Sequence, residues 1–273
     1  MEAEADWRPH LAEQSGLTWR DRYVAFMTIV AKEINRFTRI WTQTIVPPVI
    51  TISLYFVVFG NLIGPRIGDM AGHRYIDYIV PGLVMMSVIT NAYSNVVSSF
   101  FSSKFQRHIE EMLVSPVPNY IIVLGYIAGG MGRGLAVGVL VTSVSMVFAQ
   151  LHVHSLAIIF SVVLLTSMLF SLGGLINGIF AKSFDDISII PTFVLTPLIY
   201  LGGVFYSIDM LPEFWQTVSL FNPILYMINA FRYGILGHSD IPLGVSYIII
   251  IGFVVGLFAL SLWLLQRGHG IRN

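Results

Sequence analysis

Long apolar runs separated by short polar segments make up most of the chain. An α-helix rises about 1.5 Å per residue, so about 20 apolar residues are needed to cross a hydrocarbon layer of about 30 Å. The runs therefore predict an all-α integral membrane protein with six transmembrane helices. We place these helices at residues 44–63, 79–101, 121–151, 156–180, 187–205 and 245–265.

Prolines or an arginine interrupt two of these runs. Pro47 and Pro48 fall in the first turn of the first predicted span, where a missing N–H costs little. The run at 121–151 is too long for one simple crossing, and Arg133 interrupts it. We therefore expect an interfacial approach up to Arg133, followed by a crossing at 135–151.

Before the first span, residues 17–42 have the pattern of an amphipathic helix. Apolar residues from Tyr23 to Trp41 recur at helical spacing, and the basic residues keep mostly to the other face. Such a helix lies in the headgroup plane of a membrane rather than across it; a helix of a soluble domain is the alternative. We expect residues 1–16, which are polar and mixed in charge, to form a flexible tail.

A short charged segment, residues 104–117, separates the second and third spans. Phe105, Ile109, Met112 and Leu113 would share one face of a helix there, with charged residues toward the other side. Two prolines end this predicted helix. It is either an ordinary solvated helix or a rigid lever at the membrane surface that a soluble partner pushes.

Residues 208–237 are apolar but broken into two short segments. Asn222 and Pro223 suit the N-cap and first turn of the second segment. The helix that follows Pro223 is too short to cross a membrane. We therefore predict a re-entrant helical hairpin that enters and leaves one leaflet, on the side opposite the charged segment.

Composition supports a membrane protein and excludes several classes of site. Of the 273 residues, 55% are hydrophobic and 11% are charged, whereas about a quarter of a soluble domain is charged. The mean hydropathy is +0.76. A formal net charge of zero gives no nucleic-acid footprint, and the absence of cysteine excludes disulfides and thiol catalysis. His152 and His154 alone make a poor metal site, so none is predicted.

The distribution of basic residues predicts the orientation. Six spans put both termini on one side, and that side would carry most of the basic residues, namely Arg8, Arg20, Arg22, Lys32, Arg36, Arg39, Lys104, Arg107, Lys182, Arg267 and Arg272. Arg66, Arg74 and Arg232 would lie on the other side, with Arg133 at the inner border. The positive-inside rule therefore places both termini, and residues 104–117, in the cytoplasm.

With the third crossing placed at 135–151, the six predicted spans carry no charged residue. An ionisable side chain at mid-membrane costs about 2.5–3.5 kcal/mol on insertion scales, and ion-driven carriers tend to use such residues as relays. The chain also lacks G-x-x-x-x-G-K-[ST], and the glycines of residues 129–134 are more typical of close helix packing. Any energy for transport must therefore come from another protein.

Two predicted spans carry uncharged polar stripes at helical spacing. The stripe residues are Ser87, Asn91, Asn95 and Ser98 on the second span, and Thr192, Thr196 and Tyr200 on the fifth. Such stripes either hold helices together or line a path suited to an amphiphile with a polar head. In the turn before the fifth span, Asp185 and Asp186 would either cap the helix or contact a partner.

The order of these elements resembles the ABC-2 type permease family. The segments that carry the resemblance are IVPPVIT (45–51), FGNLIG (59–64), VPGLVMMSVITNAYSNV (80–96), SSFFSSKFQRHIEEMLVSPVP (98–118), FAKSFDDISIIPTFVLTPLIYLGGVFYS (180–207) and FRYGILG (231–237). Residues 17–273 would form one transmembrane domain of this family.

The resemblance implies the permease subunit of an ATP-binding-cassette exporter in a bacterial inner membrane. Two copies would form a homodimer that binds two cytoplasmic ATPase subunits, which hold ATP and Mg; the permease is not an enzyme on its own. Residues 17–42 would be the connector helix, and the two stripes would line the path of a drug or a membrane lipid. The coupling helix would contact the ATPase through Lys104, Phe105, Arg107, Ile109, Glu110, Glu111, Leu113 and Pro116.

Two other classes of function remain as alternatives. A membrane scaffold or receptor without transport would have the same spans. An intramembrane enzyme is the weaker alternative, because no Ser/His/Asp or metal constellation falls at membrane depth in the predicted spans.

Overall fold

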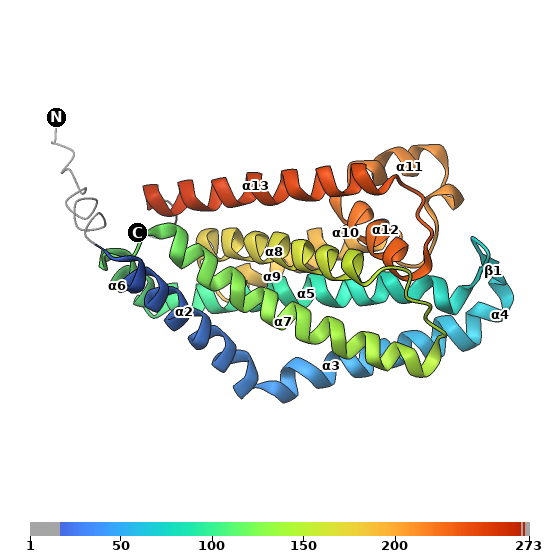
Figure 1. The fold of residues 1–273 in the computed structure, drawn as a ribbon, viewed down its shortest axis with the longest axis horizontal. Coiled ribbons are helices and arrows are strands. Elements are labelled where there is room, and N and C mark those ends of the chain that lie inside the picture. Colours follow the sequence, from blue (N-terminus) through green and yellow to red (C-terminus); the bar gives the residue numbers. More distant parts are fainter. Residues whose placement is uncertain (1–16, 269, 271–273) are drawn as a thin grey trace.

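The computed structural model describes residues 17–268 and 270, so the predicted tail at residues 1–16 lies outside the described part. Most of the described chain is helical, and the long helices lie side by side (Figure 1). The first elements are α2 (Trp19–Arg39), α3 (Trp41–Tyr55), the π-helix η1 (Phe56–Ile63), α4 (Gly64–Ile67) and the antiparallel strands β1 (Asp69–Met70) and β2 (His73–Arg74).

The rest of the chain continues the bundle. Its middle forms α5 (Tyr75–Phe105), α6 (His108–Val114), α7 (Asn119–Phe148) and α8 (Leu156–Phe180). The last elements are α9 (Asp186–Ile190), the π-helix η2 (Pro191–Leu195), α10 (Thr196–Leu201), the 3-10 helix η3 (Ile208–Met210), α11 (Glu213–Leu220), α12 (Pro223–Leu236) and α13 (Leu243–Arg267).

Within the described residues, five helices are long and apolar enough to cross a membrane: Trp41–Ile67, α5, α7, α8 and α13. They overlap five of the six predicted spans. The predicted span at 187–205 corresponds to a shorter apolar helix, Asp186–Leu201. This helix stops before Gly203, which adopts a left-handed φ of 77°. A sixth crossing therefore stays a prediction.

Helix α5 lies at the centre of the bundle, and α7 and α8 pack against it. Glycines allow the close approach: a Cβ added to Gly174 of α8 would lie 2.5 Å from the carbonyl oxygen of Tyr93 on α5. A Cβ on Gly134 of α7 would lie 3.2 Å from Cβ of Ala92. Small residues have this role at helix contacts in membranes. Close packing by the glycines of α7 is thus confirmed.

Helix α2 packs against the bundle through a face that carries both apolar and polar residues. A reciprocal pair of hydrogen bonds between Thr18 and Asp21 caps its start. Glu33 and Ile29 are buried against the bundle, whereas Tyr23 and Met27 of the predicted apolar face are exposed. The predicted apolar face is thus only partly exposed, because Phe26 is half-buried against the core.

Two local predictions about the spans are wrong. Pro47 and Pro48 lie inside α3, because the helix begins at Trp41, before the predicted boundary at residue 44. Helix α7 runs without interruption through Arg133, so the chain does not change course there. Arg133 is tolerated because its guanidinium has a polar neighbour on α5, described below.

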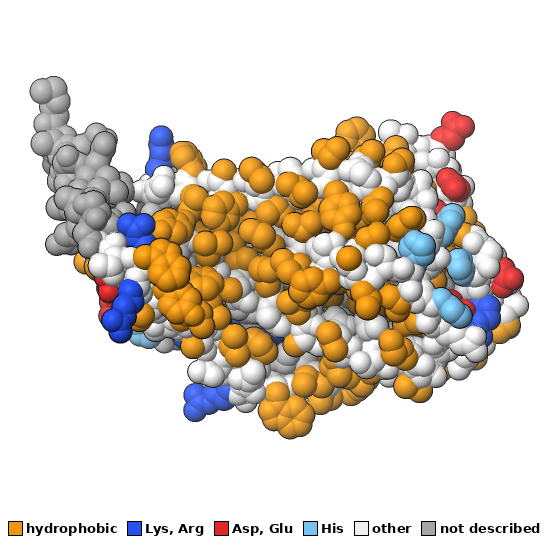
Figure 2. All heavy atoms as spheres, in the orientation of Figure 1, with side chains coloured by type: hydrophobic (Ala, Val, Ile, Leu, Met, Phe, Trp, Pro, Cys, Tyr) orange, Lys and Arg blue, Asp and Glu red, His pale blue; other side chains and the backbone are white. Residues whose placement is uncertain are grey.

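Charged side chains gather at the two ends of the bundle, with hydrophobic side chains between them (Figure 2). We call the end that holds α6 and the start of α2 the α6 end, and the opposite end, with α4 and β1, the α4 end. In this view lysine and arginine are most visible at the α6 end, and histidine and acidic residues at the α4 end. This distribution is expected of a protein whose middle lies in hydrocarbon.

Candidate functional site

The segment at 104–117 consists of two helices rather than the single helix predicted. Lys104 and Phe105 end α5, and α6 begins at His108. Arg107 lies between them with a left-handed φ of 62°, and a run of helical spacings cannot reveal such a break. The helix does end before Pro116, because Ser115 is extended, as the residue before a proline prefers.

Helix α6 is attached to the bundle by one face. Ile109 is fully buried, and Met112 and Leu113 are half-buried. Phe105, predicted on the same face, is 64% exposed because it belongs to α5. The remaining predicted contact residues, Arg107, Glu110, Glu111 and Pro116, are exposed.

Lys104 connects α5 to the end of α8. Its Nζ donates hydrogen bonds to the carbonyl oxygens of Ile179, at 2.6 Å, and Ala181, at 2.8 Å. A cation at a helix C-terminus satisfies orphan carbonyls and is favoured by the helix dipole. No local pattern indicates this contact, since the partners are 75 and 77 residues away.

The turn between α8 and α9 packs against the same place. The ring of Phe184 lies 4.9 Å from that of Phe101 and 5.3 Å from that of Phe105. Asp186 accepts hydrogen bonds from the backbone N–H groups of Lys182 and Ser183, which lowers the pKa of its carboxyl. Both N–H groups precede α9, so Asp186 closes the turn instead of capping the helix, and Asp185, the N-cap residue of α9, makes no side-chain cap hydrogen bond.

Asp185 differs from Asp186, because its side chain is exposed. The two aspartates of the turn thus separate into one that holds the backbone and one that faces outward. Together with α6, Asp185 is available to a partner at the α6 end.

The polar stripe of α5 faces charged residues of α2 and α7. Arg36 of α2 donates to Oδ1 of Asn95 at 2.8 Å and to Oγ of Ser98 at 3.2 Å. Arg133 of α7 donates from Nε to Oδ1 of Asn91 at 3.3 Å. Ser87 bonds the carbonyl of its own helix. Three of the four stripe residues therefore join α5 to its neighbours.

Glu33 completes this group of polar residues. Its carboxylate is fully buried, accepts a hydrogen bond from Ser99 at 2.6 Å and lies 3.5 Å from Nε of Arg36. The Cβ of Glu33 lies directly against Gly129 of α7. The spacing of Glu33 and Arg36, three residues apart on α2, was the available signal for this cluster.

The stripe of residues 186–201 has a different environment. Thr192, Thr196 and Tyr200 are exposed. The hydroxyl of Thr196 donates to the carbonyl of Pro191, across the π-helical turn η2. The hydroxyls of Tyr200 and Tyr55 are 3.2 Å apart. Most of this stripe is thus available to a ligand or a second chain.

At the α4 end, sequence reasoning missed a buried arginine. Arg232 of α12 is fully buried, donates to the carbonyl of Gly203 at 2.6 Å and lies 4.1 Å from the ring centroid of Tyr78. Asn222 caps α12 as predicted, by accepting from the backbone N–H of Ile224. These contacts hold α12 against α5 and against the turn that follows α10.

Comparisons with known proteins identify relatives along nearly the whole chain. The sequence model of the ABC-2 type transporter family matches residues 24–236. "Inner membrane transport permease YadH" of Escherichia coli (strain K12) is 59% identical over 251 residues, which cover 92% of this chain and 98% of that protein.

A more distant relative is "Nodulation protein J" of Rhizobium leguminosarum bv. viciae. It is 26% identical over 255 residues, which cover 91% of this chain and 92% of that protein. "Nodulation protein J" of Rhizobium meliloti (strain 1021) is 25% identical over 250 residues. The matches cover both polar stripes and the segment around α6.

Proposed function

Because the chain belongs to the ABC-2 type transporter family, we propose that it is the membrane subunit of an ATP-driven exporter. Its five long apolar helices fit a multi-pass protein of the inner membrane. The substrate we propose is amphiphilic, either a lipid or a drug-like molecule. ATP and Mg²⁺ would bind a separate ATPase subunit, because this sequence lacks a G-x-x-x-x-G-K-[ST] loop.

The attachment of α6 carries this proposal. Arg107, Glu110 and Glu111 are exposed, while Ile109 anchors the helix in the bundle. Lys104, just before α6, is bonded to the end of α8. A push on α6 would therefore move α5, α8 and the turn before α9 together, as a coupling helix requires.

Two copies of the chain would form the path. The exposed residues Thr192, Thr196 and Tyr200 favour a path or a subunit contact along 186–201. The contacts of Asn91 and Asn95 with arginines favour packing for the stripe on α5. We propose that the stripe on 186–201 lines the path. Ser87, on the α5 stripe, would lie near the wall of that path.

The proposed orientation places the α6 end in the cytoplasm. The ends of α5, α8 and α13 that carry or adjoin Lys104, Lys182 and Arg267 lie at that end (Figure 1), as does Arg107 next to α6. The positive-inside rule expects such basic residues on a cytoplasmic face. Helices α11 and α12 would then form the extracytoplasmic hairpin. A cytoplasmic ATPase would have direct access to α6 and Asp185.

The test is purification of the tagged chain from its native membrane in a mild detergent. We expect two copies of the chain and two of a soluble ATPase in one complex. Reversing two charges on α6, with Arg107→Glu and Glu111→Arg, should lower ATPase recovery and ATP hydrolysis several-fold. Arg66→Glu is the matched control, because Arg66 is exposed at the α4 end.

Two results would contradict this proposal. Recovery of the wild-type chain without any ATPase would favour the membrane scaffold or receptor. An ATPase that binds and hydrolyses ATP equally well after the charge reversal would show that α6 is not the point of contact.

A further inference from the structure

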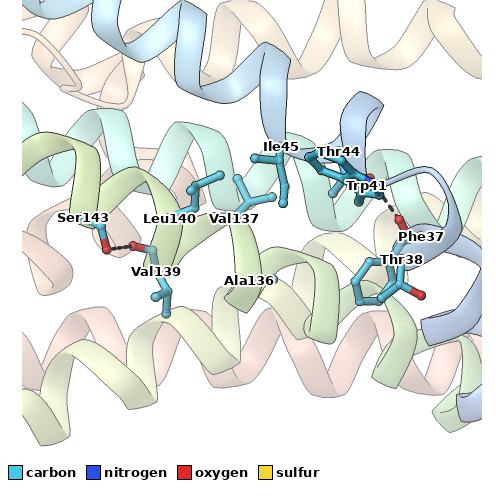
Figure 3. Close-up of a pocket in the computed structure, with 10 residues that line it drawn as sticks. All are labelled: Phe37, Thr38, Trp41, Thr44, Ile45, Ala136, Val137, Val139, Leu140 and Ser143. Atoms are coloured by element: carbon cyan, nitrogen blue, oxygen red, sulfur yellow. Dashed lines mark hydrogen bonds between the residues drawn. The ribbon is translucent and has the colours of Figure 1, made fainter.

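A groove of about 460 Å³ opens between α7 and the bend where α2 meets α3 (Figure 3). Phe37, Trp41 and Ile45 form one wall, and Ala136, Val139 and Leu140 of α7 form the other. Its volume falls within the range of about 300–1,000 Å³ typical of pockets that bury a ligand. Trp41 is 57% exposed and Val139 is 68% exposed, so the groove is open at the side of the bundle.

The hydroxyl groups that line the groove are already hydrogen-bonded within the chain. The hydroxyl of Thr44 donates to the carbonyl of Phe37, and that of Ser143 donates to the carbonyl of Val139 (Figure 3). The hydroxyl of Thr38 donates to the carbonyl of Ile34, in its own helix. A wall whose hydroxyls are already bonded favours an alkyl chain over a polar molecule.

Two arginines lie at the end of the groove nearest the α6 end. Arg36 precedes the lining residue Phe37, and Arg133 lies one turn before Ala136. Both bond α5, to Asn95 and Asn91 respectively, which are neighbours four residues apart on one helix face. A Cβ on Gly132 would lie 3.7 Å from Phe37, so Arg133 is level with the end of α2.

The charges around these arginines are not balanced. Glu33 lies 3.5 Å from Arg36. Among residues 17–268, Arg133 has no ion pair, and its one hydrogen bond uses Nε. Its terminal nitrogens are therefore available to an anion. Phosphate oxygens suit a guanidinium well, because they accept short, charge-assisted hydrogen bonds.

We propose that this groove binds an anionic phospholipid as a resident ligand. One acyl chain would lie between Trp41 and Val139, and the phosphate would bond Arg133 where the span that starts at Trp41 enters the membrane. The proposal does not depend on transport. An anionic lipid fits this groove because the apolar lining lies next to an arginine that has no ion pair among the described residues.

The experiment uses the purified chain, with any ATPase that accompanies it, in nanodiscs of phosphatidylglycerol and phosphatidylcholine. Native mass spectrometry then counts the lipids retained after release. We expect about one retained phosphatidylglycerol per chain. Arg133→Gln should lower its retention about tenfold relative to phosphatidylcholine, the factor for loss of one charged partner.

Two further variants separate the contribution of the lipid headgroup from that of the acyl chain. Val139→Trp should fill the groove and remove retention of both lipids. Arg39→Gln is the control, because Arg39 is exposed on the last turn of α2 but has no part in the groove lining. Melting temperature and elution volume establish that each variant is folded.

Several results would overturn the proposal. Retention that is unchanged in both Arg133→Gln and Val139→Trp would show that lipid binds elsewhere. An equal loss in Arg39→Gln would indicate general surface charge. If Val139→Trp separates two copies of the chain and leaves the lipid count unchanged, the groove is a subunit contact.

Discussion

The two polar stripes look alike in sequence but lie in different surroundings. On α5, Asn91 and Asn95 accept hydrogen bonds from arginines of neighbouring helices. On 186–201, Thr192 and Thr196 are exposed. Helical spacing shows that polar residues share a face, but only the neighbouring helices decide whether that face is closed or open.

The largest expected effect comes from thiol labelling, since the chain has no native cysteine. Ser87→Cys, on the closed stripe, keeps the size of the side chain and stays buried. Thr196→Cys, on the open stripe, should react with a water-soluble maleimide on the order of 100-fold faster, because a buried thiol reacts only after local opening. Labelling rates in intact vesicles measure the difference.

Phe193→Cys is the matched control for this labelling. Phe193 is also exposed on the same helix, but it is not part of the stripe. If Phe193→Cys and Thr196→Cys react equally fast, exposure alone explains the result and the stripe does not line an aqueous path.

The next largest effect concerns stability. Asn95→Leu removes the amide oxygen that accepts from Arg36, so we expect the free energy of unfolding to fall by about 2 kcal/mol. Thr192→Leu on the open stripe should change it by less than about 0.5 kcal/mol. Denaturation in detergent measures both. If the free energy of unfolding falls equally in the two variants, the α5 stripe does not hold helices together more than the stripe on 186–201 does.

A smaller effect is expected at the junction of α5 and α6. Lys104→Met removes the bonds to the carbonyls of Ile179 and Ala181, at an expected cost of about 1 kcal/mol. The substitution should also uncouple ATP hydrolysis from α6. Arg107→Met, one turn away and exposed, serves as the stability control and should leave the melting temperature unchanged.

The smallest effect is a pH dependence in the turn before the open stripe. Two backbone N–H groups lower the pKa of Asp186, so its contribution to stability is present above the unfolded value of about 3.9. That contribution is lost as pH falls through the lowered folded pKa. Asp186→Asn should remove this part of the acid transition, whereas Asp185→Asn should leave it in place.

Features that depend on local sequence were predictable. The length of an apolar run gives a span directly, and five of the predicted spans overlap long apolar helices. The Asn222–Pro223 cap depends on residues next to each other, and the structure has it. The glycines of α7 indicated close packing before their neighbours were known.

Features that depend on distant neighbours were not predictable. Arg36 and Asn95 are 59 residues apart, and no periodicity identifies which helices face each other. The helix break at Arg107 depends on one backbone angle that leaves the surrounding spacing intact. Arg133 interrupts an apolar run in sequence, yet a polar neighbour on α5 lets α7 continue.

The π-helical turn at Pro191–Leu195 gives the open stripe an unusual tolerance to a change in length. A π turn holds one residue more than an α turn of the same helix. Deleting one residue within this turn would restore α-helical geometry and leave everything downstream, including Tyr200, facing the same way. In a regular α-helix the same deletion would rotate the downstream residues by roughly 100° about the axis. A single codon could thus be lost at this turn while the second half of the stripe keeps its direction.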